Sequence, residues 1–320
     1  MAFIHEDPEF DDLLRIVAER RGLSIGVVEK DYWVTHTLWA IQHQGFEVWF
    51  KGGTSLSKGF GLIERFSEDL DVKVEPGGVT DLPLVIDWTR ESTRATAARR
   101  AYFEALARLL DVPGTEVALG VPVDGQRWTA ANLEVRYPGR HLDALGILKP
   151  FVVLEVGSAR VTPFVERDLT SFVHEYLAEI DRLGEYQDNR PRAVRCVHPL
   201  VTLIEKLDAL QNRVQRDDRE PATFVRHFED AAHIIASVPE LPALAGYSGV
   251  SALVDEMVGE RQIRQRPVSS DPVFTPGNDD RWESIRRAYE AIGPMFWGER
   301  IELDVACQTI RGWIADELEQ

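Results

Sequence analysis

The sequence predicts an α+β fold, in which a domain with a mixed sheet is followed by an α-helical domain. Between residues 46 and 156, short apolar or alternating segments of strand length are separated by turn residues and one long helical segment. After about residue 165 the apolar residues recur with helical spacing, and prolines interrupt the chain repeatedly. We therefore predict a first domain over residues 1–165 and a helical domain over residues 166–320.

The first predicted elements are two helices within residues 7–43. An apolar stripe that includes Phe10, Leu14 and Val17 marks the first, and Ser24 is a suitable N-cap for the second. The second helix carries charged residues at positions 29–31, and we expect these on its surface, with Tyr32 or Trp33 packed into the core.

The remaining elements of the first domain follow from alternation and turn residues. A helix of about twenty residues is predicted from Thr89 to Leu110. Strands are predicted at Phe46–Phe50, Asp69–Val74, Glu116–Val121, Ala131–Tyr137 and Phe151–Val156.

The segment from Lys51 to Asp71, KGGTSLSKGFGLIERFSEDLD, carries the chemistry. Gly52 and Gly53 follow a buried strand and can adopt backbone conformations that let a phosphate approach the main chain. We expect a helix from Ser55 to Glu64, whose first N–H groups point toward an anion.

Two aspartates follow this turn. Leu70, Val72 and Val74 alternate with polar residues, so Asp69 and Asp71 share one face of a strand, about 7 Å apart along it. Carboxylate pairs of this kind hold Mg²⁺, which often bridges to substrate phosphates. A phosphate-binding turn and a metal-binding carboxylate pair in this order predict nucleotidyl transfer.

These residues also resemble a known family, the AbiEii/AbiGii-type toxins of the nucleotidyltransferase superfamily, to which the MenT-like toxins are related. The stretch FKGGTSLSK at residues 50–58 and the stretch RFSEDLDV at residues 65–72 match the family pattern almost literally. The helix with EKDYWV at residues 29–34 is similar as well. The resemblance implies a polymerase-beta-like nucleotidyltransferase domain and the toxin of a bacterial toxin–antitoxin or phage-defence pair.

The resemblance further implies a set of site residues. Glu155 would be a third metal-binding acid, although a glutamate at a frayed strand end is an equal alternative. Lys206 would reach the nucleotide phosphates and Asp230 would complete the catalytic set, whereas taken alone Lys206 has the pattern of a surface lysine. The full prediction is Asp69, Asp71, Lys206 and Asp230 as catalytic residues; Gly52, Gly53, Thr54, Ser67, Lys206 and Arg213 as nucleotide-binding residues; and Asp69, Asp71 and Glu155 as metal ligands.

Composition limits the partners. The net charge of −17 over 320 residues argues against non-specific coating of nucleic acid, because such binding needs Lys and Arg to displace counterions. Two local basic stretches, at residues 88–101 and 190–226, leave room for an RNA substrate. Two cysteines exclude a disulfide framework, and neither a signal peptide nor an apolar run long enough for a membrane is present, so we expect a cytoplasmic protein without membrane contact.

The sequence therefore predicts an enzyme that moves a nucleoside monophosphate from an NTP to an acceptor, with Mg²⁺ or Mn²⁺ as cofactor. The resemblance points to tRNA or another RNA as acceptor and to a cognate antitoxin as partner. Transfer to a protein or a small molecule is one alternative, which the acidity slightly favours. A catalytically silent nucleotide-binding or partner-binding module is another, although Asp69, Asp71 and Lys206 are all retained.

Overall fold

The computed structural model describes residues 1–67, 69–145, 148–214, 216 and 220–319. The chain forms two compact units, and each is built from more than one stretch of sequence. Unit 1 comprises Met1–Gly59, Ser67–Val161 and Glu166–Cys196, and unit 2 comprises Phe60–Phe66, Thr162–Val165 and Val197–Gln320. The division into functional domains at residue 165 remains a prediction.

A mixed sheet is the framework of the fold. Its strands follow the order β3-β4-β5-β2-β1-β7-β6 in the described part of the chain. Strand β2 is antiparallel to β1 and parallel to β5, which confirms the predicted mixed sheet and the α+β class. The strands are β1 (Glu47–Lys51), β2 (Asp69–Glu75), β3 (Glu116–Pro122), β4 (Ala130–Arg136), β5 (Val152–Gly157), β6 (Phe164–Arg167) and β7 (Val194–Val197).

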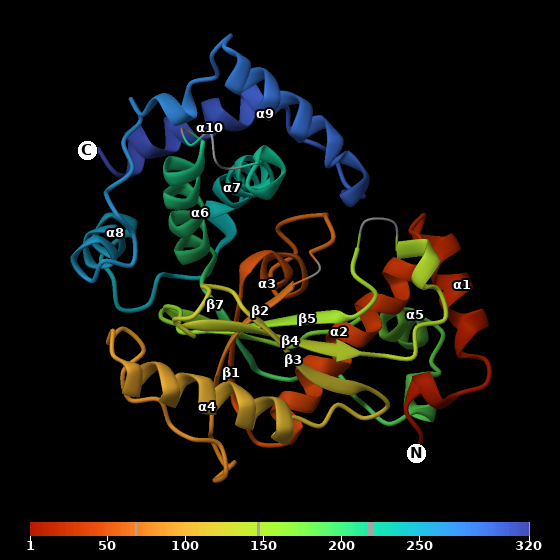
Figure 1. The fold of residues 1–320 in the computed structure, drawn as a ribbon. Helices are drawn as coiled ribbons and strands as arrows, with labels where there is room; N and C mark the ends of the chain where they lie inside the picture. Colours follow the sequence, from red (N-terminus) through yellow and green to blue (C-terminus); the bar gives the residue numbers. More distant parts are fainter. Residues whose placement is uncertain (68, 146–147, 215, 217–219, 320) are drawn as a thin grey trace. The chain divides into compact units, whose positions relative to one another are not determined.

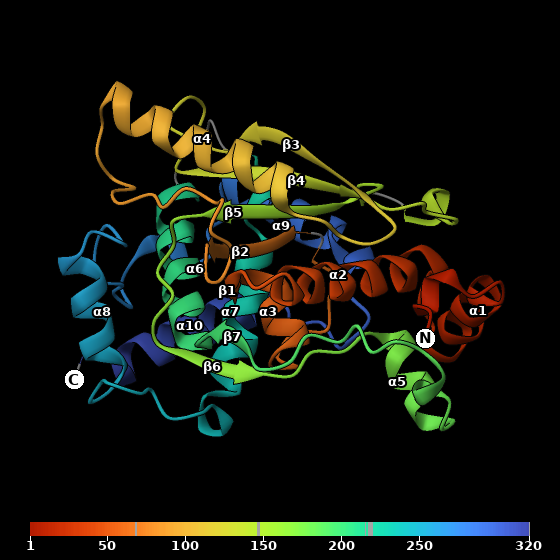
Figure 2. The same ribbon diagram turned by 90° about the horizontal axis from the view of Figure 1, so that it is seen from below.

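The alternation along β2 places its two kinds of side chain on opposite faces, as predicted. Leu70, Val72 and Val74 are buried, whereas Asp69 and Asp71 are only partly covered. Helices α3 and α4 lie on opposite sides of the sheet (Figure 1), and the turned view shows α4 lying across β3 and β4 (Figure 2). The helices of unit 1 are α1 (Phe10–Arg21), α2 (Ile25–His43), α3 (Gly52–Lys58), α4 (Thr93–Leu109) and α5 (Phe172–Glu179).

Helix α3 corrects the prediction of a helix from Ser55 to Glu64. It begins three residues earlier, at Gly52, and already ends at Lys58. Gly61 has a φ of +64°, a left-handed conformation that an α-helix cannot contain, and it lies just after this end. The glycines at 59 and 61 therefore stop a helix that apolar spacing alone would extend.

Helix α2 corrects the prediction of a surface-charged helix. Glu29, Lys30 and Asp31 are all buried, with exposed fractions of 1%, 0% and 3%. Asp31 pairs with Lys58 at the end of α3, at 2.5 Å, and Lys30 donates to the backbone oxygen of Lys149 at 2.8 Å. Buried charges are tolerated when each is paired or hydrogen-bonded, so this helix joins α3 to the chain that enters β5. The predicted N-cap is confirmed, because the Ser24 hydroxyl accepts from the N–H of Val27 at 3.2 Å.

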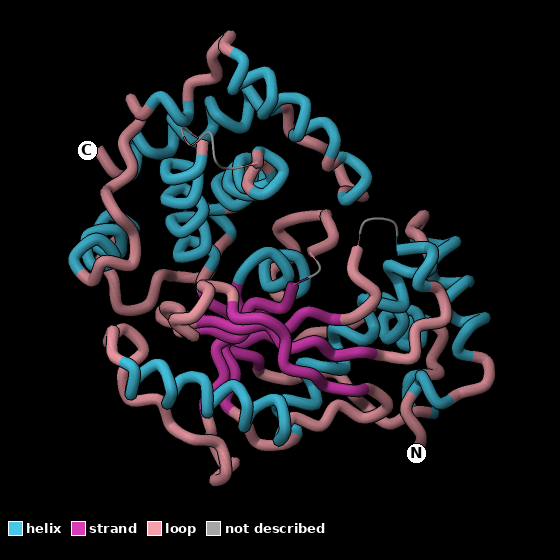
Figure 3. The backbone as a smooth tube through the Cα atoms, viewed as in Figure 1, coloured by secondary structure: helices cyan, strands magenta, loops and turns pink. Residues whose placement is uncertain are grey.

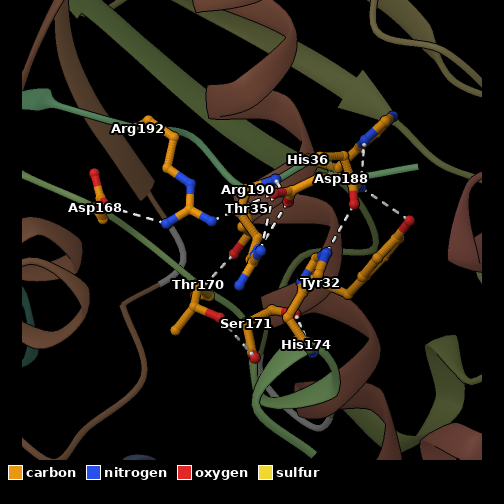
Figure 4. A network of polar contacts seen from close by, with 11 residues as sticks. Tyr32, Thr35, His36, Asp168, Thr170, Ser171, His174, Asp188, Arg190 and Arg192 are labelled. Carbon is orange, nitrogen blue, oxygen red and sulfur yellow. Dashed lines mark hydrogen bonds and ion pairs between the residues drawn. The ribbon is translucent and has the colours of Figure 1, made fainter. Parts of the chain in front are cut away.

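A polar network on the same helix fixes the segment before β7 (Figure 4). Figure 4 labels Tyr32, His36 and His174 of this network. Asn189 donates to His36 Nδ1 at 2.8 Å and to the Tyr32 hydroxyl at 3.1 Å, while its amide oxygen lies 2.7 Å from His174 Nε2. Burial lowers the pKa of His36 to about 3 and that of His174 to about 4. The two imidazoles are therefore neutral at pH 7, and they act as hydrogen-bonding parts of the core.

Unit 2 is mainly helical. After Val197 the described chain consists of helices, turns and loops, drawn cyan and pink in Figure 3. Both α6 and α10 pack against α7. Within the described residues, none of the helices has the length and apolar composition that crossing a membrane requires. The helices are α6 (Pro199–Arg213), α7 (Arg226–Ala236), α8 (Val250–Gly259), α9 (Asp280–Ala291) and α10 (Leu303–Glu317).

The expectation of a helical chain from about residue 165 is wrong at two short strands. Strand β6 spans that position, strand β7 lies beyond it, and β7 pairs in parallel with β1 through Phe50 and Cys196. Each strand has only four residues, a length at which apolar periodicity cannot distinguish a strand from a helix end. The sheet is thus completed by chain that follows the predicted first domain.

Candidate active site

The Gly-Gly-Thr turn places its first glycine against a predicted metal ligand. Gly52 has a φ of +75°, and a Cβ atom there would lie 1.8 Å from Asp71 Oδ2. Lys51, at the end of β1, is the register partner of Asp71 on β2. Glycine is therefore required at position 52 on two grounds, its left-handed backbone and the space that the Asp71 carboxylate occupies.

Thr54 connects the turn to the start of β2. Its side chain is 3% exposed, and its hydroxyl lies 2.7 Å from the carbonyl oxygen of Asp69 and 3.0 Å from that of Ser67. The single hydroxyl proton is shared between these two acceptors. The Thr54 side chain thus fixes the backbone that carries Asp69, and any contact of this turn with a nucleotide has to come from its main chain.

Three carboxylates gather on one face of the sheet. Asp69 and Asp71 lie two residues apart on β2, and Glu155 on β5 is the register partner of Asp71. Register partners on neighbouring parallel strands point to the same face, so Asp71 and Glu155 are neighbours. Asn132 on β4 follows Glu155 in the same row. Among the residues that the structure describes, no group of three or more His, Cys, Asp or Glu is arranged as a metal site.

The oxygen donors on this face nevertheless suit a hard divalent cation. Mg²⁺ is commonly held by one or two carboxylates, with substrate phosphates and water supplying the other ligands. The Asp71–Glu155 pair is a donor set of that kind, and Asp69 adds a third carboxylate on the same face.

A lysine that the sequence did not single out lies beside these acids. The ammonium of Lys149 is 3.9 Å from Asp69 Oδ1, and its side chain is 45% exposed. The buried ammonium of Lys30 holds the backbone oxygen of this residue. The sequence offered one weak indication of this role for Lys149: it is a basic residue just before an apolar strand that ends in an acid.

In unit 2, Asp230 is the centre of a buried charge cluster. Its Oδ1 accepts from Arg65 Nε at 2.7 Å, and its Oδ2 accepts from Arg65 Nη2 at 2.8 Å and from Lys206 Nζ at 2.7 Å. The exposed fractions of the three side chains are 2% for Arg65, 0% for Asp230 and 8% for Lys206. The sequence prediction brought Lys206 and Asp230 into one site, and unit 2 does place them in contact.

Burial and charge act in opposite directions on this cluster. Burial alone raises the pKa of Asp230, but the charges of Arg65 and Lys206 hold that pKa well below its usual range. For Lys206, burial lowers the pKa, the charge of Asp230 opposes this, and the charge of Arg65 adds to the lowering. Burial of its ring and the charge of Lys206 also keep the pKa of His227 well below its usual value. His227 is therefore neutral, with Nδ1 at 3.5 Å from Lys206 Nζ.

The structure corrects one property of Lys206 and leaves the others as predictions. Lys206 as a whole residue is only 7% exposed, so the interpretation of its sequence pattern as that of a surface lysine is wrong. A charged residue on an amphipathic helix is expected at the surface when only the sequence is known. The buried partner of Lys206 is Asp230, which lies on another helix, α7. Arg213, at the end of α6, is close enough for its charge to lower the pKa of His227.

Arg65 is the site residue that sequence reasoning missed. It stands at the start of the RFSEDLDV stretch but received no role there. Asp230 itself could have indicated that such a residue exists. A carboxylate buried near the apolar residues Phe228 and Ala231 requires a buried cation as its partner. The carboxylates on the sheet belong to unit 1, and this cluster belongs to unit 2.

The family described as the nucleotidyl transferase AbiEii toxin of type IV toxin–antitoxin systems matches residues 39–306. The chain belongs to this family. It is therefore a nucleotidyltransferase that uses NTP, and a type IV toxin for which the family implies a cognate antitoxin.

Other comparisons add less. Among solved structures the AbiEii-type toxin is similar to MenT4, a nucleotidyltransferase toxin from Mycobacterium tuberculosis, with 16% sequence identity and a TM-score of 0.40. The similarity covers 86% of this chain and 88% of that one, and at this level it carries no argument about function. No curated protein matches the chain.

Proposed function

We propose that this AbiEii-type toxin transfers a nucleoside monophosphate from an NTP to RNA, with tRNA as the acceptor and Mg²⁺ or Mn²⁺ as the metal. The observation that carries the proposal is the Asp71–Glu155 pair on neighbouring strands, packed against the glycine turn at Gly52. Asp69, Asp71 and Glu155 would hold the metal, which would supply activation of the attacking oxygen and stabilisation of charge on the leaving pyrophosphate.

The protein's own residues have distinct parts in this proposal. The main chain of Gly52, Gly53 and Thr54 and the hydroxyl of Ser67 would contact the triphosphate. Lys206 would neutralise charge on its outer phosphates as a point charge, with Arg213 beside it. The Lys206 cluster and the aspartates are connected in the sequence, since Arg65 precedes Asp69 by four positions.

A second acceptor class has an observation in its favour. Several cations in the two basic stretches are already engaged. Arg99 is buried and donates to the backbone oxygen of Arg127 at 2.9 Å. Arg190 and Arg192 both pair with Asp188, as Figure 4 shows, and the side-chain hydrogen bond from Arg190, with a smaller contribution from that of Arg192, lowers the pKa of Asp188. Cations held by carboxylates contribute less to phosphate binding, which favours a protein or small-molecule acceptor.

One labelling experiment separates these acceptors. The purified toxin is incubated with each α-³²P-labelled NTP, Mg²⁺, total RNA and cell protein, and the products are separated by size and by nuclease or protease sensitivity. The proposal predicts label in nuclease-sensitive RNA of tRNA size, which disappears when the metal is chelated. Label in protein would support the alternative, and absence of any labelled product with all NTPs would contradict the proposed transfer.

The biological role is tested in cells. Induced expression without the antitoxin should arrest bacterial growth, and Asp71→Ala should relieve the arrest at equal expression. A part in phage defence predicts that cells with the toxin and its antitoxin resist phage better than cells with the Asp71→Ala toxin. Equal phage sensitivity would contradict that part.

A further inference from the structure

Arg65 is held in place from several directions. Its Nη1 donates to the carbonyl oxygen of Phe66 at 3.1 Å, in addition to its two bonds to Asp230. The backbone around it is also fixed, because Arg65 forms an antiparallel bridge with Phe296, and the N–H of Phe66 donates to the carbonyl of Met295 at 2.9 Å. A guanidinium fixed in this way presents a rigid fork to the carboxylate.

Asp230 is enclosed within the protein and does not face a ligand. It is fully buried, and its two oxygens accept three hydrogen bonds from Arg65 and Lys206. Of the three charged residues, Lys206 is the closest to solvent, with a side chain that is 8% exposed. Any contact with a substrate phosphate therefore has to be made by the lysine, and Asp230 acts through it.

The charges in this cluster do not balance. Arg65 and Lys206 are cations, Asp230 is a single anion, and His227 is neutral, so these four residues carry one net positive charge. If Asp230 and Lys206 were alone, the carboxylate would neutralise the ammonium. With Arg65 present, the carboxylate is already matched, and the positive charge of Lys206 is left for an anion.

We propose that Arg65 is a positioning residue for Lys206. By fixing and neutralising Asp230, it holds the lysine ammonium in one place with its charge unmatched, ready for the phosphates of an NTP. A free lysine side chain has several rotamers, and holding one of them in advance removes an ordering cost from binding. This inference rests on the proposed role of Lys206 in nucleotide binding.

The test measures the affinity for an α,β-methylene NTP in the presence of Mg²⁺ by titration calorimetry, so that no transfer occurs. Arg65→Gln should weaken binding by about tenfold or more. Arg65→Lys, which keeps the charge but loses the fork, should fall between Arg65→Gln and the wild type. In the Lys206→Gln background, Arg65→Gln should cause less than about a twofold further loss, because it acts only through the lysine.

A matched control comes from the neighbouring residue on α7. Glu229 is also fully buried, and both of its oxygens accept from Arg300 Nε at 2.8 Å. The Arg300 side chain is 28% exposed, against 2% for Arg65, but Arg300→Gln likewise removes the cation that pairs with a fully buried carboxylate, and it does not touch Asp230 or Lys206. It should lower the melting temperature as Arg65→Gln does, yet leave the NTP affinity within about twofold of the wild type.

The outcomes are separable. The inference is overturned if Arg65→Gln, or Arg65→Lys should the former not fold, binds the analogue as tightly as the wild type. It is also overturned if the effects of Arg65→Gln and Lys206→Gln simply multiply, or if Arg300→Gln weakens binding equally. A wild-type protein that binds the analogue through Lys206 and Arg65 but labels no acceptor would contradict the proposed transfer and leave this inference supported.

Discussion

Removing the charge of Asp230 should destabilise unit 2 more than any other single change in the cluster. Asp230→Asn keeps the shape of the side chain, but it leaves two buried cations, Arg65 and Lys206, without their anion. Breaking a buried ion pair on one side costs about 3–5 kcal/mol, because an uncompensated charge stays in the interior. Lys206→Met should cost less, about 1.5–3 kcal/mol, because Asp230 keeps both bonds to Arg65.

The measurement is hydrogen exchange of the amides in α6 and α7, read by mass spectrometry at pH 7, which reports the local free energy of opening for each helix. This choice avoids treating a chain of two units as a single cooperative transition. Because the pKa of Asp230 is held below its unfolded value, its contribution is complete above about pH 4 and is lost only as the pH falls below that value. The difference between variant and wild type should therefore be constant from pH 6 to pH 8. A loss below 1 kcal/mol for Asp230→Asn, or a larger loss for Lys206→Met, would refute this reasoning.

Two further predictions concern unit 1. Gly52→Ala should abolish transfer and displace the Asp71 carboxylate, since the new Cβ would lie 1.8 Å from it. The control is Gly22→Ala, at a position with a φ of +64° and no described atom within 4 Å, which should lower the free energy of unfolding by only about 1–2 kcal/mol and keep the activity. Equal activity in both variants would contradict the argument. The pKa values of His36 and His174, about 3 and 4 in the folded protein, lie below the unfolded value of about 6.5. The free energy of opening of the α2 and α5 amides, read by hydrogen exchange, should therefore be constant above pH 6.5 and fall as the pH drops toward 4. His174→Gln should make that fall shallower, and an unchanged slope would count against the neutral network.

The sequence predicted the carboxylates better than their surroundings. Alternation placed Asp69 and Asp71 on one face of a strand, and the resemblance added Glu155; the structure sets all three on that face, while their role as metal ligands stays a prediction. The sequence explained only one of the two reasons for a glycine at position 52. Its backbone freedom follows from the residue type, but the carboxylate that fills the space beside it belongs to Asp71, which is distant in the sequence.

Long-range pairing explains the failures. Taken alone, Lys206 had the pattern of a surface lysine, and Arg65 received no role, because the residue that pairs with both, Asp230, lies far from each in the sequence. Helix α2 seemed to be charged on its surface for the same reason, since the partner of Asp31 is Lys58 in the next helix. Local patterns show that a charge is present, but they do not show which distant residue neutralises it.

The central claim is that the carboxylates on β2 support nucleotide transfer. The most direct test compares the wild type with Asp71→Asn and with Glu75→Gln in the Mg²⁺-dependent labelling of acceptor from an α-³²P-labelled NTP. Glu75 lies on the same strand and the same face, four residues further on, and it pairs with Lys73 at 2.7 Å. The account predicts full labelling by Glu75→Gln and loss of at least a hundredfold in rate for Asp71→Asn, equivalent to about 2.7 kcal/mol of transition-state stabilisation. Labelling by Asp71→Asn at the wild-type rate would contradict it.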